Sequence, residues 1–442
     1  MPASPIDSAI YRQLFGDKDA GALFSDSAEV RAMMLVEGAL AKVQGELGVI
    51  PETAGKAIHR ASMELQLDPG VLAAGAGQSA VPVPALVAAF REAMQAPEHA
   101  SWVHWGATSQ DIMDTALALR LRQALGIFNT RLLAVIRALG TLADAHAEVP
   151  MVARTYGQAA VVTTFGAQVA SWGAPLLRAR AKLDAVLSEV AQVSLSGAAG
   201  TLSAMEKGPE VRAALAEALG LSDPQASWHS TRDGIAGLSA WMTLLCGSLG
   251  KMGEDLLLMT QHGIGEVRLA SAGGSSTMPQ KANPIAPSLL VAIARQSVGL
   301  NSVLQSALPH RQQRDGAAWM TEWLSLPQLV ILTARALGAA ETLARTLTPD
   351  DKAMARGIDA TGGTLFAEPL SFALCDEMQR PDAQARVKEL IAEAAQAGEP
   401  LQTVVEKAYP NQDTAQILDP FQHLGTAPAE ARAFAATARE AR

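Results

Sequence analysis

Residues 117–142 read LALRLRQALGIFNTRLLAVIRALGTL and place an apolar side chain at every third or fourth position. These positions are Leu117, Leu121, Leu125, Phe128, Leu132, Val135, Leu139 and Leu142. A repeat of about 3.5 residues, held over several heptads, is typical of long helices that pack side by side at shallow angles. A helix over this segment would be about 39 Å long at ~1.5 Å per residue.

The same spacing returns in other parts of the chain, at Val162–Val193, Ile235–Met259 and, more loosely, Leu290–Leu304 and Trp323–Leu347. The sequence therefore predicts an all-α protein, an elongated bundle of long helices. Five such helices carry more apolar surface than one chain can cover, so we expect a homo-oligomer with a core of helices from several subunits. A coiled-coil scaffold without chemistry is the alternative reading of the same pattern.

Three domains are predicted from the way this pattern changes along the chain. Residues 1–100 indicate several short helices, among them one over residues 28–47 that follows Asp26 and one from Pro51 to about Leu65. Residues 101–349 form the central bundle. Residues 350–442 indicate a small helical domain with a turn at Gly362-Gly363.

Composition narrows the class of protein. The 442 residues carry a net charge of −9 without a basic run, which argues against nucleic acid as a partner. The eight His residues lack metal-site spacing, so neither a metal nor another cofactor is expected. Cys246 and Cys375 are too few for a disulfide framework. With no signal segment or charge-free membrane span, we expect a cytoplasmic protein that does not contact a membrane.

The segment 272–287, AGGSSTMPQKANPIAP, is a polar loop between two of the apolar repeats. Gly273 and Gly274 allow the backbone to approach a ligand closely. Asn283 and Pro284 suit the N-cap and first position of a helix. With the charge of Lys281, these features favour a carboxylate or phosphate pocket that presents Ser275 or Ser276. A simple connector before a capped helix is the alternative.

Residues 274–284, GSSTMPQKANP, resemble the signature loop of the fumarase/aspartase superfamily, whose members eliminate a group β to a carboxylate or add it in reverse. The resemblance implies that Ser275 is the general base and that Lys281 and Asn283 bind substrate carboxylate and stabilise the enolate. It also implies substrate contacts from Ser276 and Met278.

A second polar cluster, residues 101–111, precedes the first long helix. Thr108 and Asp111 have the spacing of a capping box, with Asp in place of the usual Glu or Gln. The segment resembles the first characteristic region of the superfamily. That resemblance implies substrate contacts from Thr108, Ser109 and His104.

Residues 154–158, RTYGQ, resemble the second region of the superfamily, where many lyases carry His directly after Thr. Here Tyr156 stands in that position, which argues against an adenylosuccinate or argininosuccinate lyase. Tyr156 is a candidate proton donor, although an ordinary tyrosine pKa of ~10 makes it a weak acid at neutral pH. His146 and His104 are further candidates, and Gln158 is a candidate carboxylate ligand.

The segments Trp228–Asp233 and His310–Trp323 are also rich in Arg and His, which suits binding of several carboxylates. The part from Arg314 to Trp323 resembles the lactonizing enzymes that act on 3-carboxy-cis,cis-muconate, although Gln313 stands where those relatives carry Glu. The resemblance implies a cycloisomerase that forms 4-carboxymuconolactone, with Arg314 binding an extra acid group.

The expected partners are therefore a small polycarboxylate substrate and copies of the same chain, in a homotetramer whose sites are shared between subunits. A fumarate-releasing lyase and a non-catalytic helical oligomer are the alternatives.

Overall fold

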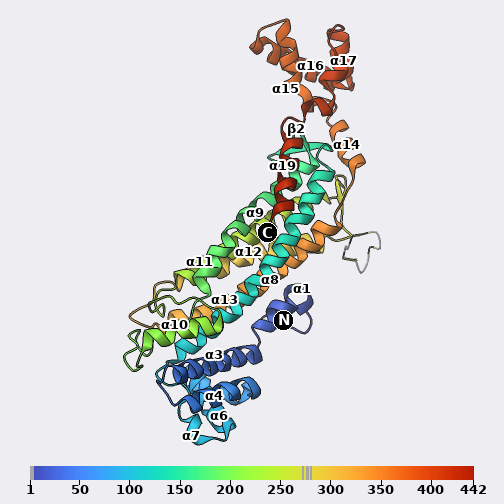
Figure 1. The fold of residues 1–442 in the computed structure, drawn as a ribbon. Coiled ribbons are helices and arrows are strands. Elements are labelled where there is room, and N and C mark those ends of the chain that lie inside the picture. Colours follow the sequence, from blue (N-terminus) through green and yellow to red (C-terminus); the bar gives the residue numbers. More distant parts are fainter. Residues whose placement is uncertain (1–3, 271–272, 275–277, 279–280) are drawn as a thin grey trace. The chain divides into compact units, whose positions relative to one another are not determined.

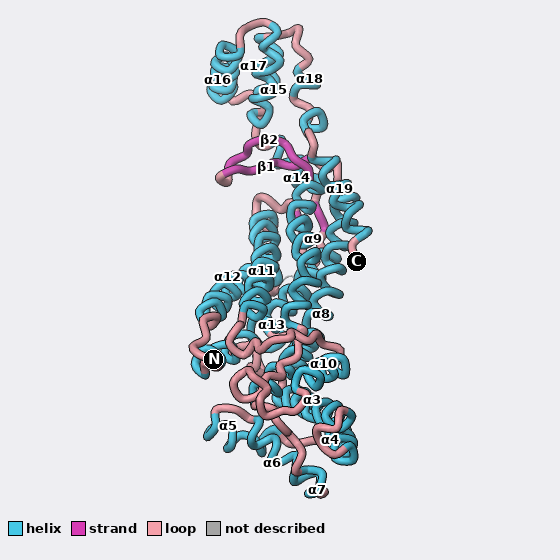
Figure 2. Tube along the Cα trace, turned by 60° about the vertical axis from the view of Figure 1, so that its left-hand side comes forward, coloured by secondary structure: helices cyan, strands magenta, loops and turns pink. Residues whose placement is uncertain are grey.

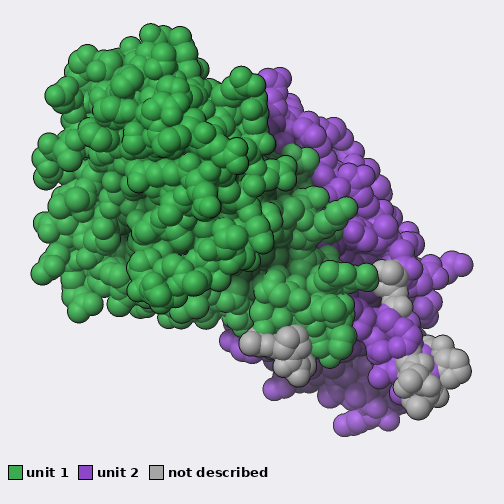
Figure 3. Space-filling model, turned by 90° about the horizontal axis from the view of Figure 1, so that it is seen from below, with its two compact units in different colours: residues 1–131, 179–247, 292–338 green, residues 132–178, 248–291, 339–442 purple. Residues whose placement is uncertain are grey.

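The structure is a computed structural model that describes residues 4–270, 273–274, 278 and 281–442. It divides into two compact units (Figure 3), each assembled from three chain segments. Unit 1 comprises Met1–Arg131, Ala179–Gly247 and Ala292–Gly338, and unit 2 comprises Leu132–Arg178, Ser248–Val291 and Ala339–Arg442. The three-domain division, with boundaries at residues 100 and 349, stays a prediction.

Five long helices confirm the predicted all-α class (Figure 1). They are α8 (Ser109–Ala145), α9 (Phe165–Val190), α11 (Asp233–Met259), α12 (Ile285–Ser306) and α13 (Gly316–Thr346). Each covers most of one predicted apolar repeat, because the residues at that spacing are the ones that the bundle buries, such as Leu125 and Phe128 in α8.

Side chains between neighbouring helices hold each unit together. In unit 1 the rings of Phe128 and Trp241 stack with centroids 6.3 Å apart, and Ser239 donates to the Asn301 amide oxygen at 2.7 Å. In unit 2 the buried Trp172 donates its indole N–H to Asp255 Oδ2 at 2.7 Å. These contacts join α8 to α11, α11 to α12, and α9 to α11, as expected for a bundle.

Short helices form the N-terminal part of unit 1 (Figure 1). They are α1 (Arg12–Phe15), α2 (Lys18–Leu23), α3 (Asp26–Glu46), α4 (Glu52–Glu64), η1 (Pro69–Leu72), α5 (Ala73–Ser79), α6 (Val83–Met94) and α7 (Pro97–Ala100). The hydroxyl of Ser25, rather than Asp26, caps α3 by accepting from Ala28 N at 3.3 Å. Their core is continuous with α10 (Gly208–Leu219), through Val211 and Leu215.

The segment before α9 corrects one expectation. The apolar pattern placed a helix from Val162, but residues Pro150–Thr155 (β1) and Gln158–Thr164 (β2) pair as an antiparallel hairpin (Figure 2). Tyr156 and Gly157 form its two-residue turn, and both have the positive φ that such tight turns require. A second small sheet pairs β3 (Val267–Arg268) with β4 (Thr348–Pro349).

The remaining helices lie in unit 2. They are α14 (Asp351–Asp359), η2 (Thr364–Phe366), α15 (Ala367–Ala373), η3 (Leu374–Asp376), α16 (Arg380–Ala397), α17 (Leu401–Ala408), α18 (Thr414–Ile417), η4 (Pro420–His423) and α19 (Ala427–Glu440). Helices α15–α17 share a small core around Leu370 and Leu390. Gly362 and Gly363 both have positive φ, which confirms the predicted turn. The last helix, α19, instead packs on α9, where Gly173 leaves room for the Phe434 ring.

Helices α8 and α13 are long and apolar enough to cross a membrane by length and composition alone. Both nevertheless carry buried charged residues that are paired inside the protein, Asp114 in α8 and Glu322 in α13. Buried charges that are paired inside the protein are also what the core helices of a bundle show.

Candidate functional site

The N-terminal end of α8 is organised by a buried carboxylate. Asp111 Oδ2 accepts from the Thr108 backbone N–H at 3.0 Å, which confirms the predicted capping-box contact. The same carboxylate accepts from the backbone N–H groups of Ser196 and Gly197 and lies 2.8 Å from His229 Nε2. Asp111 thus ties three separate loops of unit 1 to the beginning of one helix.

Arg314 reaches this helix end from the loop before α13. Its Nε donates to Gln110 Oε1 at 2.8 Å, and its Nη2 donates to Thr108 Oγ1 at 3.2 Å and to the Ala198 carbonyl at 3.3 Å. Two predicted substrate-binding residues, Thr108 and Arg314, are therefore in direct contact. Both are only partly buried, as is Ser109. A guanidinium beside a helix N-terminus suits a ligand carboxylate.

A buried ion cluster lies behind Gln110. Arg232 is 1% exposed and donates to Asp114 at 2.7 Å through Nη1 and to Glu322 at 2.9 Å through Nε. Trp319 Nε1 also donates to Asp114, at 3.2 Å. Burial lowers the pKa of Arg232, but the charges of Asp114 and Glu322 outweigh burial and raise it overall.

The pKa of Glu322 is shifted in the opposite direction from that of Arg232. Burial raises its pKa, but nearby His310 and Arg232 lower it below the ordinary value overall. Both shifts favour the charged forms of Arg232 and Glu322. Because Gln110 Nε2 donates to Asp114 at 3.1 Å, the cluster also fixes the amide that receives Arg314.

His104 occupies the loop that leads to α8. Its Nδ1 is 2.7 Å from the carboxylate of Glu37, a fully buried residue of α3. Burial lowers the pKa of His104, but the hydrogen bond and charge of Glu37 outweigh burial, so the pKa lies above its ordinary value. His104, Thr108, Ser109 and Arg314 all belong to unit 1.

The predicted residues of the second region belong to unit 2. Tyr156 is fully exposed at the tip of the β1–β2 hairpin, and Gln158 is exposed beside it. Below the tip, Arg154 Nη2 donates to the buried carboxylate of Glu266 at 2.8 Å. No partner of the Tyr156 hydroxyl is found among the described residues, so within one chain the tip projects into solvent.

The signature loop is closed at its base by main-chain hydrogen bonds. Gly273 and Asn283 exchange two of them, each 2.9 Å long. A Cβ atom on Gly273 would lie 2.6 Å from Ile285 Cγ1, so a larger residue there would force the Ile285 side chain to shift, whereas Gly274 faces open space. The helix start is shifted from the prediction: α12 begins at Ile285, and Pro284 O rather than Asn283 O accepts from Ser288 N.

The loop's side chains are described only in part. Lys281 and Met278 are exposed, and Asn283 is partly buried. Ser275 and Ser276, the predicted base and its neighbour, lie outside the described residues. Their roles, like those of the other predicted site residues, stay predictions.

Sequence reasoning missed several residues of this region. It quoted the segments that contain Gln110, Arg232 and Glu322 but did not pair them, since pairing depends on remote parts of the chain. It missed Glu37 altogether. A signal existed: Glu37 is the one charged residue in the otherwise apolar run 32–41, AMMLVEGALA, where an acid has to find a partner.

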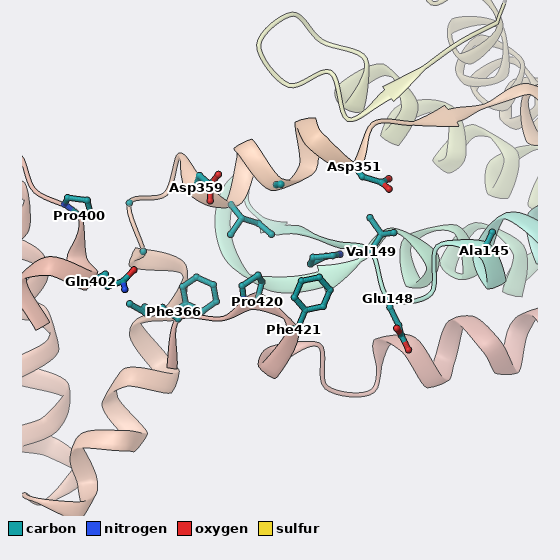
Figure 4. Close-up of a pocket in the computed structure, with 16 residues that line it drawn as sticks. Ala145, Glu148, Val149, Asp351, Asp359, Phe366, Pro400, Gln402, Pro420 and Phe421 are labelled. Carbon is teal, nitrogen blue, oxygen red and sulfur yellow. The ribbon is translucent and has the colours of Figure 1, made fainter. Parts of the chain in front are cut away.

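A cavity in unit 2 lies apart from the predicted residues, none of which lines it. Its volume is about 620 Å³. In Figure 4, Asp351 and Asp359 extend from α14, and Phe366, Pro420 and Phe421 lie opposite them. Across the described part of the chain, no group of three or more His, Cys, Asp or Glu side chains is arranged to hold a metal ion.

Comparisons with known proteins extend over most of the chain. Residues 12–299 match the family model described as Lyase. A Pseudomonas aeruginosa relative named 3-carboxy-cis,cis-muconate cycloisomerase is 37% identical over 92% of this chain and 92% of its own length. A nitrosuccinate lyase from Streptomyces davaonensis is 34% identical over 96% of this chain and 94% of its own length.

A solved structure is similar over the same extent. The crystal structure of 3-carboxy-cis,cis-muconate lactonizing enzyme from Pseudomonas putida superimposes with a TM-score of 0.92 and 31% identity. The match covers 98% of this chain and 99% of that one. The similarity therefore extends over almost the whole of both chains.

Proposed function

The chain belongs to the lyase family, within the fumarase/aspartase superfamily as its signature loop predicts, and on this premise we propose that it is a 3-carboxy-cis,cis-muconate cycloisomerase. It converts 3-carboxy-cis,cis-muconate to 4-carboxymuconolactone, a step of bacterial protocatechuate breakdown in the β-ketoadipate pathway. The observation that carries the proposal is that a relative 37% identical over 92% of both chains bears this name, and that a solved structure of the same activity superimposes with a TM-score of 0.92. We expect the enzyme to act in the cytoplasm.

The chemistry agrees with the residues available. One carboxylate oxygen of the substrate adds to a double bond conjugated with another carboxylate, and the α carbon is then protonated. In reverse, this is β-elimination of a carboxylate, so one base and one enolate-binding pocket serve both directions. Because the substrate reacts with itself, holding it in the folded conformation supplies several kcal/mol of barrier reduction.

The residues take the following roles in this proposal. Ser275 handles the α proton, and Lys281 stabilises the enolate. Arg314 binds the extra acid group, and its contact with Thr108 supports this role because both present polar groups at one helix end. The other carboxylate contacts come from Ser109, Gln158, Ser276, Met278 and Asn283. Tyr156 stands where the resemblance expects a histidine proton donor.

The proposed assembly is a homotetramer with shared sites. Large apolar side chains are exposed on three of the long helices, for example Leu258 of α11, Val298 of α12 and Leu324 of α13. Exposed apolar surface along bundle helices supports packing against other copies of the chain. The exposure of Tyr156 supports sharing, since a residue that acts on substrate needs a second surface to enclose it.

The substrate assay tests the proposal directly. Purified enzyme is incubated with 3-carboxy-cis,cis-muconate, and the loss of diene absorbance is followed. We expect turnover that Ser275→Ala abolishes and that Ser288→Ala, a change at an exposed hydroxyl bonded to Pro284 O, leaves intact. Absence of turnover together with efficient adenylosuccinate or argininosuccinate cleavage would overturn the proposal.

A fumarate-releasing lyase is the second candidate. The match to a nitrosuccinate lyase supports it, because elimination next to a carboxylate uses the same base and the same enolate pocket. The Tyr156 substitution argues against the adenylosuccinate and argininosuccinate lyases. A third candidate, a non-catalytic helical oligomer, requires that Ser275→Ala leave every measured activity unchanged.

A further inference from the structure

Glu37 is a buried acid in the middle of α3, 1% exposed and surrounded by apolar neighbours. Its Oε1 lies 2.7 Å from His104 Nδ1, and its Oε2 has no hydrogen-bond partner among the described residues. An ionised carboxylate without an opposite charge is costly in such surroundings. His104 is therefore the group that compensates it.

The backbone fixes the position of the His104 ring. His104 adopts a φ of 65°, and Gly106 follows with a φ of 71°. The Trp105 carbonyl between them accepts from Gln44 Nε2 at 2.8 Å, which anchors this turn to α3. A left-handed conformation in a non-glycine residue is strained and persists only where the surroundings impose it. The ring orientation is thus determined by the fold and by Glu37 together.

The charges around His104 come from three helices. Glu37 on α3 and Asp111 on α8 favour the protonated ring, whereas Arg91 on α6 opposes it. Burial also opposes it, yet the balance raises the pKa of His104 above its ordinary value. A raised pKa favours the imidazolium form, which carries a positive charge and can bind an anion.

We propose that Glu37 is a positioning residue: it occupies Nδ1 of a protonated His104 and so leaves Nε2 of the imidazolium for a substrate carboxylate, the contact that the family resemblance implies for His104. The proposal rests on the proposed function in that it takes the ligand to be a polycarboxylate. It also separates two roles: His104 binds, and it does not donate the α proton.

The first measurement is the His104 titration midpoint, followed by NMR on protein with labelled histidine and assigned with His104→Gln. We expect a midpoint above about 6.5 in the wild type and a fall of about one pH unit or more in Glu37→Gln. Glu98→Gln is the matched control, because Glu98 is 3.8 Å from His99 but is 68% exposed. It should leave the His104 midpoint unchanged.

The second measurement is binding of the unreactive tricarboxylate propane-1,2,3-tricarboxylate across the same pH range. In the wild type the dissociation constant should rise about tenfold as the pH passes the His104 midpoint, and in Glu37→Gln this rise should move to lower pH. Glu37→Asp, which retracts the carboxylate by one methylene, should give an intermediate result if Glu37→Gln folds poorly.

The outcomes separate this proposal from the proposed function. An unchanged His104 midpoint in both Glu37 variants overturns the Glu37 proposal. A dissociation constant that does not change as the pH passes the His104 midpoint also overturns it. Failure to turn over 3-carboxy-cis,cis-muconate, with both pH effects intact, counts against the cycloisomerase activity and leaves the Glu37 role supported. A merely structural role of Glu37 predicts loss of stability without either pH effect.

Discussion

Gln110 Oε1 accepts a hydrogen bond from Arg314 Nε at 2.8 Å, and the amide nitrogen of Gln110 donates to Asp114 and to the His229 carbonyl. Both the oxygen and the nitrogen of this buried amide therefore have hydrogen-bond partners. The partly buried Arg314 guanidinium is therefore oriented, through Gln110, by the buried carboxylate of Asp114. A substrate bound by Arg314 would thus depend on residues that it never touches.

Replacing Gln110 should weaken substrate binding more than it slows the chemical step. In Gln110→Leu the Arg314 Nε loses its acceptor, so the guanidinium samples other rotamers and the KM for 3-carboxy-cis,cis-muconate should rise about tenfold or more, with a smaller change in kcat. Steady-state kinetics measures this. Gln328→Leu, at an exposed helical glutamine bonded only to the Leu324 carbonyl, is the control. An unchanged KM in Gln110→Leu would show that Arg314 does not depend on this contact.

Arg232→Met should destabilise the protein strongly. The change removes the guanidinium that pairs with the buried carboxylates of Asp114 and Glu322, and breaking such a cluster typically costs about 3–5 kcal/mol. Denaturant unfolding at fixed protein concentration measures the free energy. The control is Arg60→Met, where the side chain is 79% exposed beside Glu64 and a change within about 0.5 kcal/mol is expected. Equal effects in the two variants would contradict the role given to the cluster.

Gly173→Ala tests the packing of α19 on α9. An added Cβ would lie 1.9 Å from Phe434 Cζ, so the ring has to move, and a loss of about 1–3 kcal/mol is expected. Gly126→Ala is the matched change in α8, where the new methyl group meets nothing within 4 Å. It should be stabilising by about 0.5–1 kcal/mol, because alanine favours a helix over glycine. Thermal unfolding of the two variants should therefore shift in opposite directions.

The Cys246 thiol should be unreactive in the folded protein. Burial raises its pKa to about 11, so at about pH 8 almost none of it is the reactive thiolate. Labelling with iodoacetamide, followed by peptide mass analysis, should modify Cys246 only after denaturation. Cys375, which is partly exposed, provides the internal comparison. Rapid labelling of Cys246 in the native protein would contradict the burial.

The pairing of Glu37 with His104 should also affect stability as the pH changes. The pKa of folded His104 is raised, so its contribution is complete below the unfolded value of about 6.5 and is lost as the pH rises through the folded value. The difference in unfolding free energy between wild type and His104→Gln should therefore shrink as the pH rises above about 6.5. A difference that stays constant over this range would mean that the pair does not titrate.

The elements that could be predicted are those whose cause is local. The helix of residues 109–145 follows from its own apolar spacing, and the contact of Asp111 with Thr108 follows from their separation of three residues. The hairpin of residues 150–164 was missed because a short segment with a few apolar residues, such as 160–165 (AVVTTF), fits a strand as well as a helix start.

Remote pairings could not be predicted from one sequence. Nothing near Glu37 indicates that its partner is 67 residues away, and nothing near Arg232 indicates which two acids enclose it. Burial of these charges depends on the tertiary packing that brings α3, α8 and α13 to them. The same reason explains why Thr108 and Arg314 could each be singled out while their contact could not.

The two main-chain hydrogen bonds between Gly273 and Asn283 hold the two ends of the signature loop together, which makes the loop suitable for replacement as one unit. The chain enters and leaves it at adjacent points, so grafting residues 274–282 from a related lyase would leave the helices on either side in register. Chimaeras of this kind offer a route to retuning substrate choice without redesigning the scaffold, provided that glycine is kept at position 273.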